Sequence, residues 1–394
     1  MAAIKRLTVA LSALLVIMAV PGKGLAEDYA AVQTYIHGFD NGVTVYTGVF
    51  ALNKDLDLDT STYFKYNVDL INPSFGEGGG GGGDSLKSTG GSVAAVSGAS
   101  SAVSAGGGSD TRHDLTAGIT HNFNNIIGVE AYYDYSREKD YVSNTPTITL
   151  KKDLFDKNTT LTIGYSRNMD TISGKFVDTD KSRTTDNYFV GLTQVLSPFT
   201  IAQIGYSRNN SRGFESEGIR LVPLNGVDIS TCTDKSATCV DEAHPGTRSR
   251  EAVLFGVNHY FLDGLGGVLE RASVKLNLRY YKDDWKIRSY TGEIEYNKYL
   301  RDDLILRLGY RYYTQTKAYF VKDIYTVSDA LKTSSPQLLA LDTHLVDAKL
   351  TYLFPKEEGI SGVRLGSAEA KYAYYRESIG VSAHIVMLAL RLVF

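Results

Sequence analysis

The sequence predicts a transmembrane antiparallel β-barrel of the up-and-down type, an all-β fold. Apolar and polar residues alternate with a period of two along most of the chain, which is typical of strands. After the first 26 residues, no segment approaches the ~18 consecutive apolar residues that a spanning helix needs. The chain also ends on an aromatic residue, Phe394. Because lipid leaves no backbone group unpaired, a membrane protein without spanning helices must close its sheet into a barrel.

The C-terminal segment shows the alternation most clearly. Arg391 and Ala389 lie on one face, and the other face is wholly apolar, with Leu392, Leu390, Leu388 and Val386. One lipid-facing side is what the last strand of an outer-membrane barrel needs. An amphipathic ring is favoured at the membrane interface, so Phe394 is expected to mark the C-terminal strand that inserts into the membrane.

The first 26 residues are interpreted as a Sec signal peptide, cleaved after Ala26. Lys5 and Arg6 precede a mainly apolar region of 14 residues from Leu7 to Val20, which is too short for a membrane helix. The expected location is therefore the outer membrane of a Gram-negative bacterium. Removing this segment leaves 38 basic and 44 acidic residues, a net charge of −6. That mild acidity argues against nucleic acid as a partner.

Residues 27–394 are predicted to form a single barrel domain of about sixteen strands, with fourteen or eighteen left open. Short connections alternate with long ones, and outer-membrane barrels place short turns at the periplasm. With Phe394 at the periplasmic end, both termini are predicted to be periplasmic. The predicted strands are 31–38, 42–54, 58–72, 111–123, 126–140, 144–155, 159–173, 184–197, 200–213, 249–262, 271–286, 288–300, 304–320, 343–354, 366–377 and 380–394.

Three long external loops are expected, at 73–110, 214–248 and 321–342. The first contains a glycine run and a Ser/Ala/Gly tract, too poor in apolar residues to fold alone. It is either an external loop or a segment folded into the lumen. The second holds the only two cysteines, Cys232 and Cys239. Since both lie in one loop of an exported chain, they are predicted to form a local disulfide.

The polar faces of the strands are expected to line the lumen, and function is sought there. The inward residues comprise eight basic and seven acidic side chains. Such a balance predicts weak charge selectivity if the lumen is an open, water-filled pore; a largely plugged lumen is the alternative. The predicted pore-lining residues are Lys65, Asp69, Glu130, Asp134, Lys275, Arg279, Glu293, Glu295, Arg307, Arg311, Asp347, Lys349, Glu369, Lys371 and Arg391.

A short sequence repeat indicates that several strands end in the same way. Ile163-Gly-Tyr-Ser-Arg-Asn168 returns as Ile204-Gly-Tyr-Ser-Arg-Asn209, and Leu308-Gly-Tyr-Arg311 is a looser copy. The tyrosine is expected to mark an interfacial girdle. The glycine is expected where the wall bends or packs closely.

The mature chain resembles a family of bacterial outer-membrane barrels of about this length, catalogued as a domain of unknown function. The residues that carry the resemblance are Val96-Ser-Gly-Ala-Ser100 and the segment from Tyr374 to Val386 that continues to Phe394. The resemblance implies an outer-membrane, porin-like barrel and no established activity.

Three functions follow as hypotheses. The first is a passive, porin-like channel for small hydrophilic solutes or ions. The second is a scaffold that sheathes a periplasmic partner protein such as a multihaem cytochrome. The third is a hydrolase at the barrel rim, for which His113 beside Asp114 and His344 near Asp342 are the candidate residues. No Gly-x-Ser-x-Gly elbow, His-Glu-x-x-His or Cys-x-x-Cys-His motif occurs, so no enzyme, metal or cofactor is predicted. The expected partners are outer-membrane lipid and the barrel assembly machinery, and self-association is left open.

Overall fold

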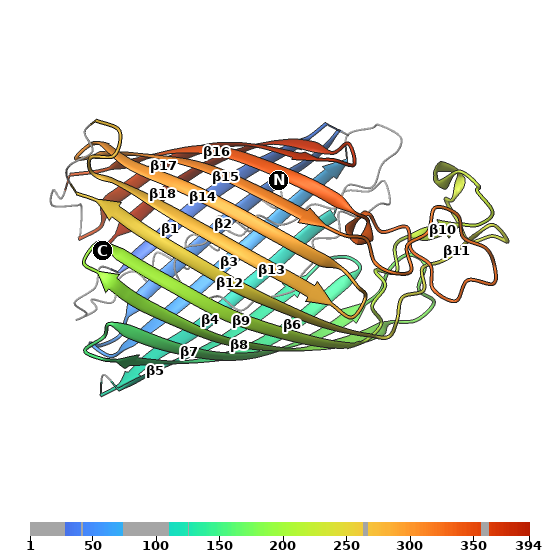
Figure 1. The fold of residues 1–394 in the computed structure, drawn as a ribbon, viewed down its shortest axis with the longest axis horizontal. Coiled ribbons are helices and arrows are strands. Elements are labelled where there is room, and N and C mark those ends of the chain that lie inside the picture. The colour runs from blue at the N-terminus through green and yellow to red at the C-terminus, as the bar shows by residue number, and fades with distance from the viewer. Residues whose placement is uncertain (1–27, 41, 74–109, 125, 263–266, 356–361) are drawn as a thin grey trace.

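Sixteen antiparallel strands form a closed barrel in the computed structural model, which describes residues 28–40, 42–73, 110–124, 126–262, 267–355 and 362–394 (Figure 1). Neighbours in sequence are neighbours in the sheet, and β1 pairs with β18 to close it. The barrel strands are β1 Tyr29–Phe39, β2 Val43–Asp55, β3 Thr60–Pro73, β4 Asp110–Phe123, β5 Ile127–Arg137, β6 Tyr141–Leu154, β7 Thr159–Ile172, β8 Lys181–Ser197, β9 Thr200–Gly213, β12 Thr247–Phe261, β13 Ala272–Asp283, β14 Arg288–Arg301, β15 Leu304–Gln315, β16 Leu341–Leu353, β17 Arg364–Glu377 and β18 Ser382–Val393.

The predicted fold class is confirmed, with each of the sixteen expected strands present and no further strand in the barrel. Three strands end at least three residues earlier than their alternation suggested. The strand expected at 126–140 stops at Arg137, because the chain turns where the Glu138 N–H donates to the Tyr141 carbonyl at 2.7 Å. The strand expected at 304–320 stops at Gln315, because its side-chain Nε2 donates to the carbonyls of Gln337 and Leu339 at 2.8 and 2.6 Å. The strand expected at 271–286 stops at Asp283, whose carboxylate accepts the Ile287 N–H at 2.9 Å and closes a turn.

The outer face of the wall is apolar. In one row across four neighbouring strands, Leu192, Ile204, Phe255 and Leu278 lie opposite one another and are 39–52% exposed. Large apolar side chains this exposed on every strand of a row would be costly in water. A belt of this kind is the lipid-facing surface of a transmembrane barrel. Within the described ranges, no helix is long and apolar enough to cross a membrane.

The two ends of the barrel differ. One end, here the turn end, carries both ends of the described barrel and short connections such as 198–199 and 302–303. There the Phe394 N–H donates to the Asp28 carbonyl at 3.1 Å. The opposite end, the loop end, carries the long connections 214–246 and 316–340, which project beyond the wall (Figure 1). Residues 1–27 and 74–109, with the predicted signal peptide and most of the glycine-rich loop, lie outside the described residues.

The two long connections fold together into a cap at the loop end. Strands β10 (Leu221–Pro223) and β11 (Cys239–Asp241) pair within the first connection, beside the 3₁₀ turn η1 (Ile229–Thr231). Backbone bridges join Leu224 to Tyr325 and Ala243 to Lys332, so the first connection is tied to the second. The second connection includes η2 (Pro336–Leu338).

The cap has a small apolar core. Trp285, from the β13–β14 turn, packs against Phe320 with ring centroids 5.3 Å apart, and both are nearly fully buried. The Trp285 indole N–H donates to the Thr247 carbonyl at 3.0 Å, so its polar atom is satisfied. At the cap surface, hydrogen bonds from the Lys322 ammonium and the Thr326 N–H lower the pKa of Asp329 to about 2. This turn therefore keeps its carboxylate charged well into acid pH.

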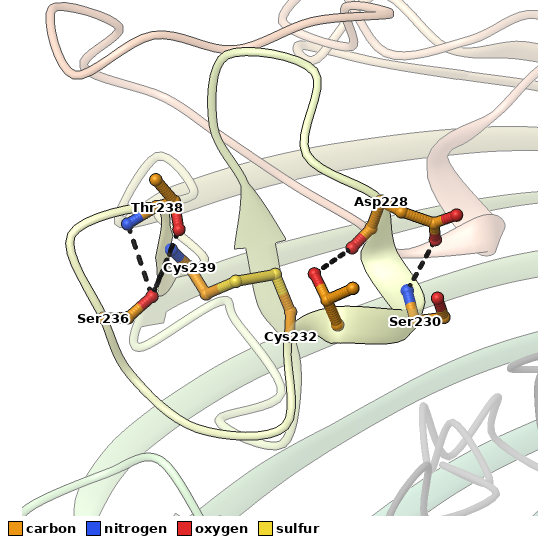
Figure 2. The surroundings of a disulfide bond; sticks show 7 residues. Asp228, Ser230, Cys232, Ser236, Thr238 and Cys239 are labelled. Atoms are coloured by element: carbon orange, nitrogen blue, oxygen red, sulfur yellow. Dashed lines mark hydrogen bonds between the residues drawn. A yellow bond between two sulfur atoms is a disulfide. The ribbon is translucent and has the colours of Figure 1, made fainter.

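The predicted disulfide is confirmed: Cys232 and Cys239 are bonded within the cap (Figure 2). Asp228 caps η1 by accepting the Ser230 N–H at 2.8 Å, and this hydrogen bond holds the pKa of Asp228 below its usual range. The Ser236 hydroxyl accepts the Cys239 N–H at 3.0 Å on the other side of the bond. The bonded loop is thus braced at both ends by side-chain hydrogen bonds.

Replacing both Cys232 and Cys239 with serine is expected to loosen this loop and leave the barrel intact. Opening a closed loop of this short length removes about 2–3 kcal/mol of chain-entropy stabilisation. Limited proteolysis should therefore cut between Asp228 and Cys239 faster in the variant. Gel mobility of the unheated, folded barrel should stay unchanged. Equal cleavage rates in the two proteins would contradict the expectation.

Candidate functional site

The fifteen residues predicted to line the lumen all lie on the strand face opposite the apolar belt, here called the inner face. On β15, for example, Leu308 and Tyr310 belong to the outer face while Arg307 and Arg311 alternate with them. Glu130, Glu295 and Asp347 are buried, Arg391 is exposed, and the remaining eleven are half-buried. Whether these side chains line an open pore stays a prediction.

The inner face of β14–β17 carries a connected charge cluster. Asp347 accepts from Arg307 at 3.1 Å and lies 3.5 Å from the Lys371 ammonium. Arg307 also approaches Glu295 at 3.9 Å. Asp347 therefore lies between two cations from the strands on either side of its own. Beside this group, Lys349 donates to Glu369 at 2.9 Å, an adjacent pair on the same wall.

Gly309 allows Asp347 to lie against the wall. A Cβ atom built on Gly309 would come within 2.5 Å of the Asp347 carboxylate oxygen Oδ2. A side chain at 309 would therefore push this carboxylate into the lumen and away from Arg307. Gly309 belongs to the loose third copy of the repeat, whose glycine was expected where the wall packs closely. In this copy the closely packed neighbour is the charged side chain of Asp347.

The strand opposite β15 turns two carboxylates inward. In a ring of sixteen strands, β5 lies eight strands from β15 in either direction. Strand β5 turns Glu130 and Asp134 inward, where Glu130 pairs with Lys151 of β6 and Asp134 accepts from the Thr116 hydroxyl at 2.6 Å. The two arginines of β15 and the two carboxylates of β5 therefore lie on opposite strands of the ring, which predicts a transverse electric field.

The inner face of β6–β9 is polar but uncharged near mid-wall. Asn187 donates to Asn168 at 2.6 Å, and Asn168 donates to the Thr145 hydroxyl at 2.9 Å. Asn209 donates in turn to Asn187. This row of linked amides is buried over most of its length. Asn168 and Asn209 are the last residues of the two repeat copies, so the repeat places matching amides on the inner face.

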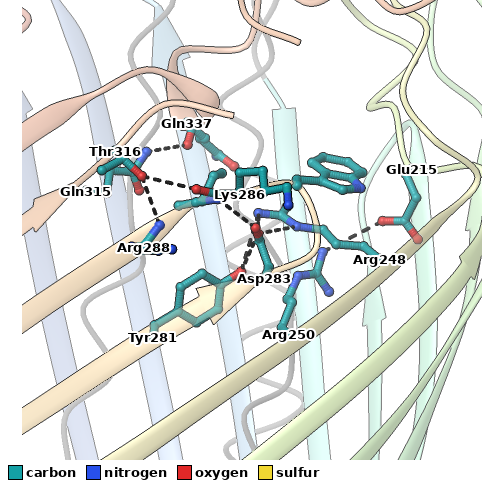
Figure 3. A network of polar contacts seen from close by, with 12 residues as sticks. Glu215, Arg248, Arg250, Tyr281, Asp283, Lys286, Arg288, Gln315, Thr316 and Gln337 are labelled. Atoms are coloured by element: carbon teal, nitrogen blue, oxygen red, sulfur yellow. Dashed lines mark hydrogen bonds and ion pairs between the residues drawn. The ribbon is translucent and has the colours of Figure 1, made fainter. Parts of the chain in front are cut away.

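A second charged network lies inside the wall at the loop end (Figure 3). The Arg248 guanidinium donates to Asp283 at 2.6 and 2.9 Å and lies 4.2 Å from the Trp285 ring centroid. Arg250 approaches Glu215 of the cap at 3.7 Å. These contacts join the inner wall to the cap. The alternation of apolar and polar residues predicted none of these charged residues as inward-facing, because they lie near strand ends or in the loops.

Further inner-face charges were also missed by sequence reasoning. Lys151 follows Leu150 of the apolar face, so extending the alternation along β6 would have found it. Asp170 of β7 and Arg183 of β8 also lie on the inner face and form an ion pair at 2.9 Å. Arg112 of β4 donates to the Ser136 hydroxyl at 3.2 Å. With these residues, the inner face is more highly charged than predicted.

The histidines considered for catalysis face outward. The Tyr66 hydroxyl and His113 Nδ1 are 2.7 Å apart, and Tyr310 and His344 repeat the arrangement at 2.9 Å. Tyr372 and His384 form a third such pair at 2.7 Å. Asp114, by contrast, lies on the inner face. A histidine and a tyrosine on a lipid-facing rim are typical of an interfacial girdle. In the described part of the chain, no group of three or more His, Cys, Asp or Glu residues is arranged to hold a metal ion.

A family profile matches the chain over residues 5–178 and 175–347. The chain belongs to the DUF3570 family, described as a protein of unknown function. The resemblance drawn from the sequence is therefore confirmed. The motif at 96–100 falls within the matched range but outside the described residues, and the motif that begins at Tyr374 lies beyond the match. DUF3570 membership itself assigns no activity.

Several solved outer-membrane proteins are similar to this DUF3570 chain. OccK1 (OpdK) of Pseudomonas aeruginosa is 8% identical with a TM-score of 0.42, covering 93% of this chain and 98% of that chain. A bacterial polysaccharide outer membrane secretin is 8% identical with a TM-score of 0.49 and the same coverage. A loop-deletion mutant of OmpT from Vibrio cholerae is 10% identical with a TM-score of 0.42, covering 92% and 98%. No curated protein matches the sequence.

Proposed function

We propose that this protein is a passive channel in the bacterial outer membrane for small hydrophilic solutes or ions, with weak charge selectivity. The observation that carries the proposal is the charged inner face. Side chains of Arg307, Lys349 and Glu369 are 24, 21 and 25% exposed there. Partly exposed charges on the inside of a barrel need water, because their desolvation is not fully offset by pairing. A hydrated lumen between two charged walls is what a passive channel requires.

The expected selectivity follows from the arrangement of the charges. Basic side chains on β15 face acidic side chains on β5, and the fifteen predicted residues nearly balance in sign. A transverse field orients dipolar solutes without excluding either ion, so cations and anions should both pass.

The orientation in the membrane is part of the same proposal. Outer-membrane barrels keep short turns at the periplasm and long loops outside. The turn end, with Asp28 and Phe394, is accordingly periplasmic, and the cap is external. Export through the predicted signal peptide of residues 1–26 and insertion by the barrel assembly machinery, with Phe394 on the last strand, complete this proposal.

Planar-bilayer conductance of the refolded mature chain, alone in simple salt, tests the function directly. Stable open-channel steps are expected, with a small reversal potential in a salt gradient because selectivity is weak. A barrel that is folded by gel mobility yet electrically silent would overturn the passive channel. A sheath for a periplasmic partner protein would then become the better hypothesis, tested by co-purification from cell envelopes.

A further inference from the structure

The outer face at the loop end is layered over five neighbouring strands, β8, β9, β12, β13 and β14. One row is apolar, as described for the belt. The next row toward the loops is rich in tyrosine, and the row beyond it is charged. Paired positions in the tyrosine row are Val190, Tyr206, Val253, Tyr280 and Tyr290. Those in the charged row are Tyr188, Arg208, Glu251, Lys282 and Arg288.

Tyrosine rings mark the level of the lipid headgroups in membrane proteins. Each row lies two residues further along the strands, a step of about 6–7 Å that strand tilt reduces to about 5 Å along the membrane normal. On each of these strands the residue of the charged row therefore lies beyond the tyrosine row toward the loops, just outside the apolar belt. Its side chains face neither the lumen nor the cap.

The charged row contains a cation–carboxylate–cation unit. Glu251 lies between Arg208 at 3.8 Å and the Lys282 ammonium at 3.1 Å, each approaching a different carboxylate oxygen. The two cationic side chains are 49 and 56% exposed. One carboxylate thus holds two cationic side chains close together, and the unit has a net charge of +1.

A second unit of the same design stands beside it. Asp186 lies 3.8 Å from Arg167 and 3.4 Å from Arg212, and it accepts the Tyr165 hydroxyl at 2.8 Å. The two arginines are 51 and 69% exposed, while the Asp186 side chain is 10% exposed. Each unit takes one arginine from a copy of the Tyr-Ser-Arg repeat, Arg167 or Arg208. The repeat therefore builds two equivalent cationic sites on the outer face.

The remaining outer face at the loop end is different. Toward the loop end of β4, β16 and β18 the outer face holds His113, His344 and His384, each beside a tyrosine. The two units, Arg167–Asp186–Arg212 and Arg208–Glu251–Lys282, are here called the basic sector. The sector carries a net charge of +2 from four cations and two carboxylates.

We propose that the basic sector binds the phosphoryl groups of anionic lipid in the outer leaflet. Guanidinium groups bind phosphate oxygens in pairs, and a site at the edge of the apolar belt is less screened than one in bulk water. A lipid whose chains lie on the belt brings its phosphates to the loop-side edge of the belt, where the basic sector lies. The inference rests on the outer-membrane location proposed above and not on whether the barrel conducts.

Native mass spectrometry of the detergent-purified full barrel, with added bisphosphorylated lipid A, tests the site. The variant Arg208→Gln with Arg212→Gln removes one cation from each unit, and Lys282 and Arg167 remain to neutralise the carboxylates. Retention of lipid A is expected to fall at least tenfold. The matched control, Arg137→Gln with Arg376→Gln, removes two outward arginines on β5 and β17 and should retain lipid as the unaltered protein does.

Further arms separate the sources of the phosphoryl group. Dephosphorylated lipid A should be retained poorly by all proteins, and inorganic phosphate alone should not displace bound lipid A at millimolar concentration. Equal retention by both variants, or equal retention of the dephosphorylated lipid, would overturn the proposal. The proposal would also be overturned if the Arg208/Arg212 variant retained lipid A but lost a bound second copy of the chain. Conductance of this variant should match the unaltered protein, so a failed channel and a failed lipid site give different results.

Discussion

Replacing Asp347 with alanine is expected to make the channel prefer anions and to destabilise the barrel wall. The carboxylate lies between Arg307 and Lys371 on the inner face, and its loss leaves both cations without their nearest partner. The cost should fall between the ~1 kcal/mol of an exposed pair and the ~3–5 kcal/mol of breaking a buried one. Reversal potentials in a salt gradient would measure the selectivity, and heat-dependent gel mobility the stability.

Asp342→Ala is the matched control for this prediction. Asp342 lies on the same strand as Asp347 but on the outer face, where it accepts the Tyr312 hydroxyl at 3.2 Å. It removes the same charge without changing the lumen, so the reversal potential should not move. If both variants shift selectivity equally, the inner-face assignment of Asp347 is wrong.

Replacing Phe320 with alanine is expected to unfold the cap while the barrel stays closed. Phe320 is 4% exposed and packs against Trp285, and truncating a buried aromatic side chain costs about 3–5 kcal/mol. The cap core is small, so a loss of this size should exceed its local stability. Trp285 is the only tryptophan of the chain, and its fluorescence reports on the cap alone. A red-shifted emission maximum with unchanged gel mobility is the expected result.

Tyr319→Ala supplies the comparison. Tyr319 is the neighbouring residue but is 56% exposed, so its truncation removes little buried area. Its emission maximum should stay close to that of the unaltered protein. A native-like emission from the Phe320→Ala variant would show that the cap does not depend on this core.

The barrel wall was predictable because strand geometry is simple. Side chains alternate strictly, so one apolar residue such as Leu308 fixes the direction of Arg307 and every other residue of its strand. The fifteen predicted inner residues follow from that rule. The disulfide followed from having two cysteines in one loop.

The cap was not predictable in the same way. Its contacts join residues far apart in sequence, such as Leu224 with Tyr325, and no local pattern signals them. The alternation around Phe320 even extended the predicted strand, because an apolar residue buried in a cap resembles one facing lipid. The carboxylates of β5 and the arginines of β15 were predicted to face inward, but only the order of strands around the ring shows that these two strands lie opposite each other.

The cap also sets an order of assembly. Its two connections are separated by strands β12–β15, and Trp285 enters from a turn between them. The bridges that join the two connections can therefore form only after the two intervening hairpins have been placed in the wall, since contacts of long sequence separation close late. The bond between Cys232 and Cys239 spans a sequence separation of 7 and has no such requirement. Oxidation can thus precede insertion, whereas the cap is completed late, once β12–β15 have taken their places in the wall.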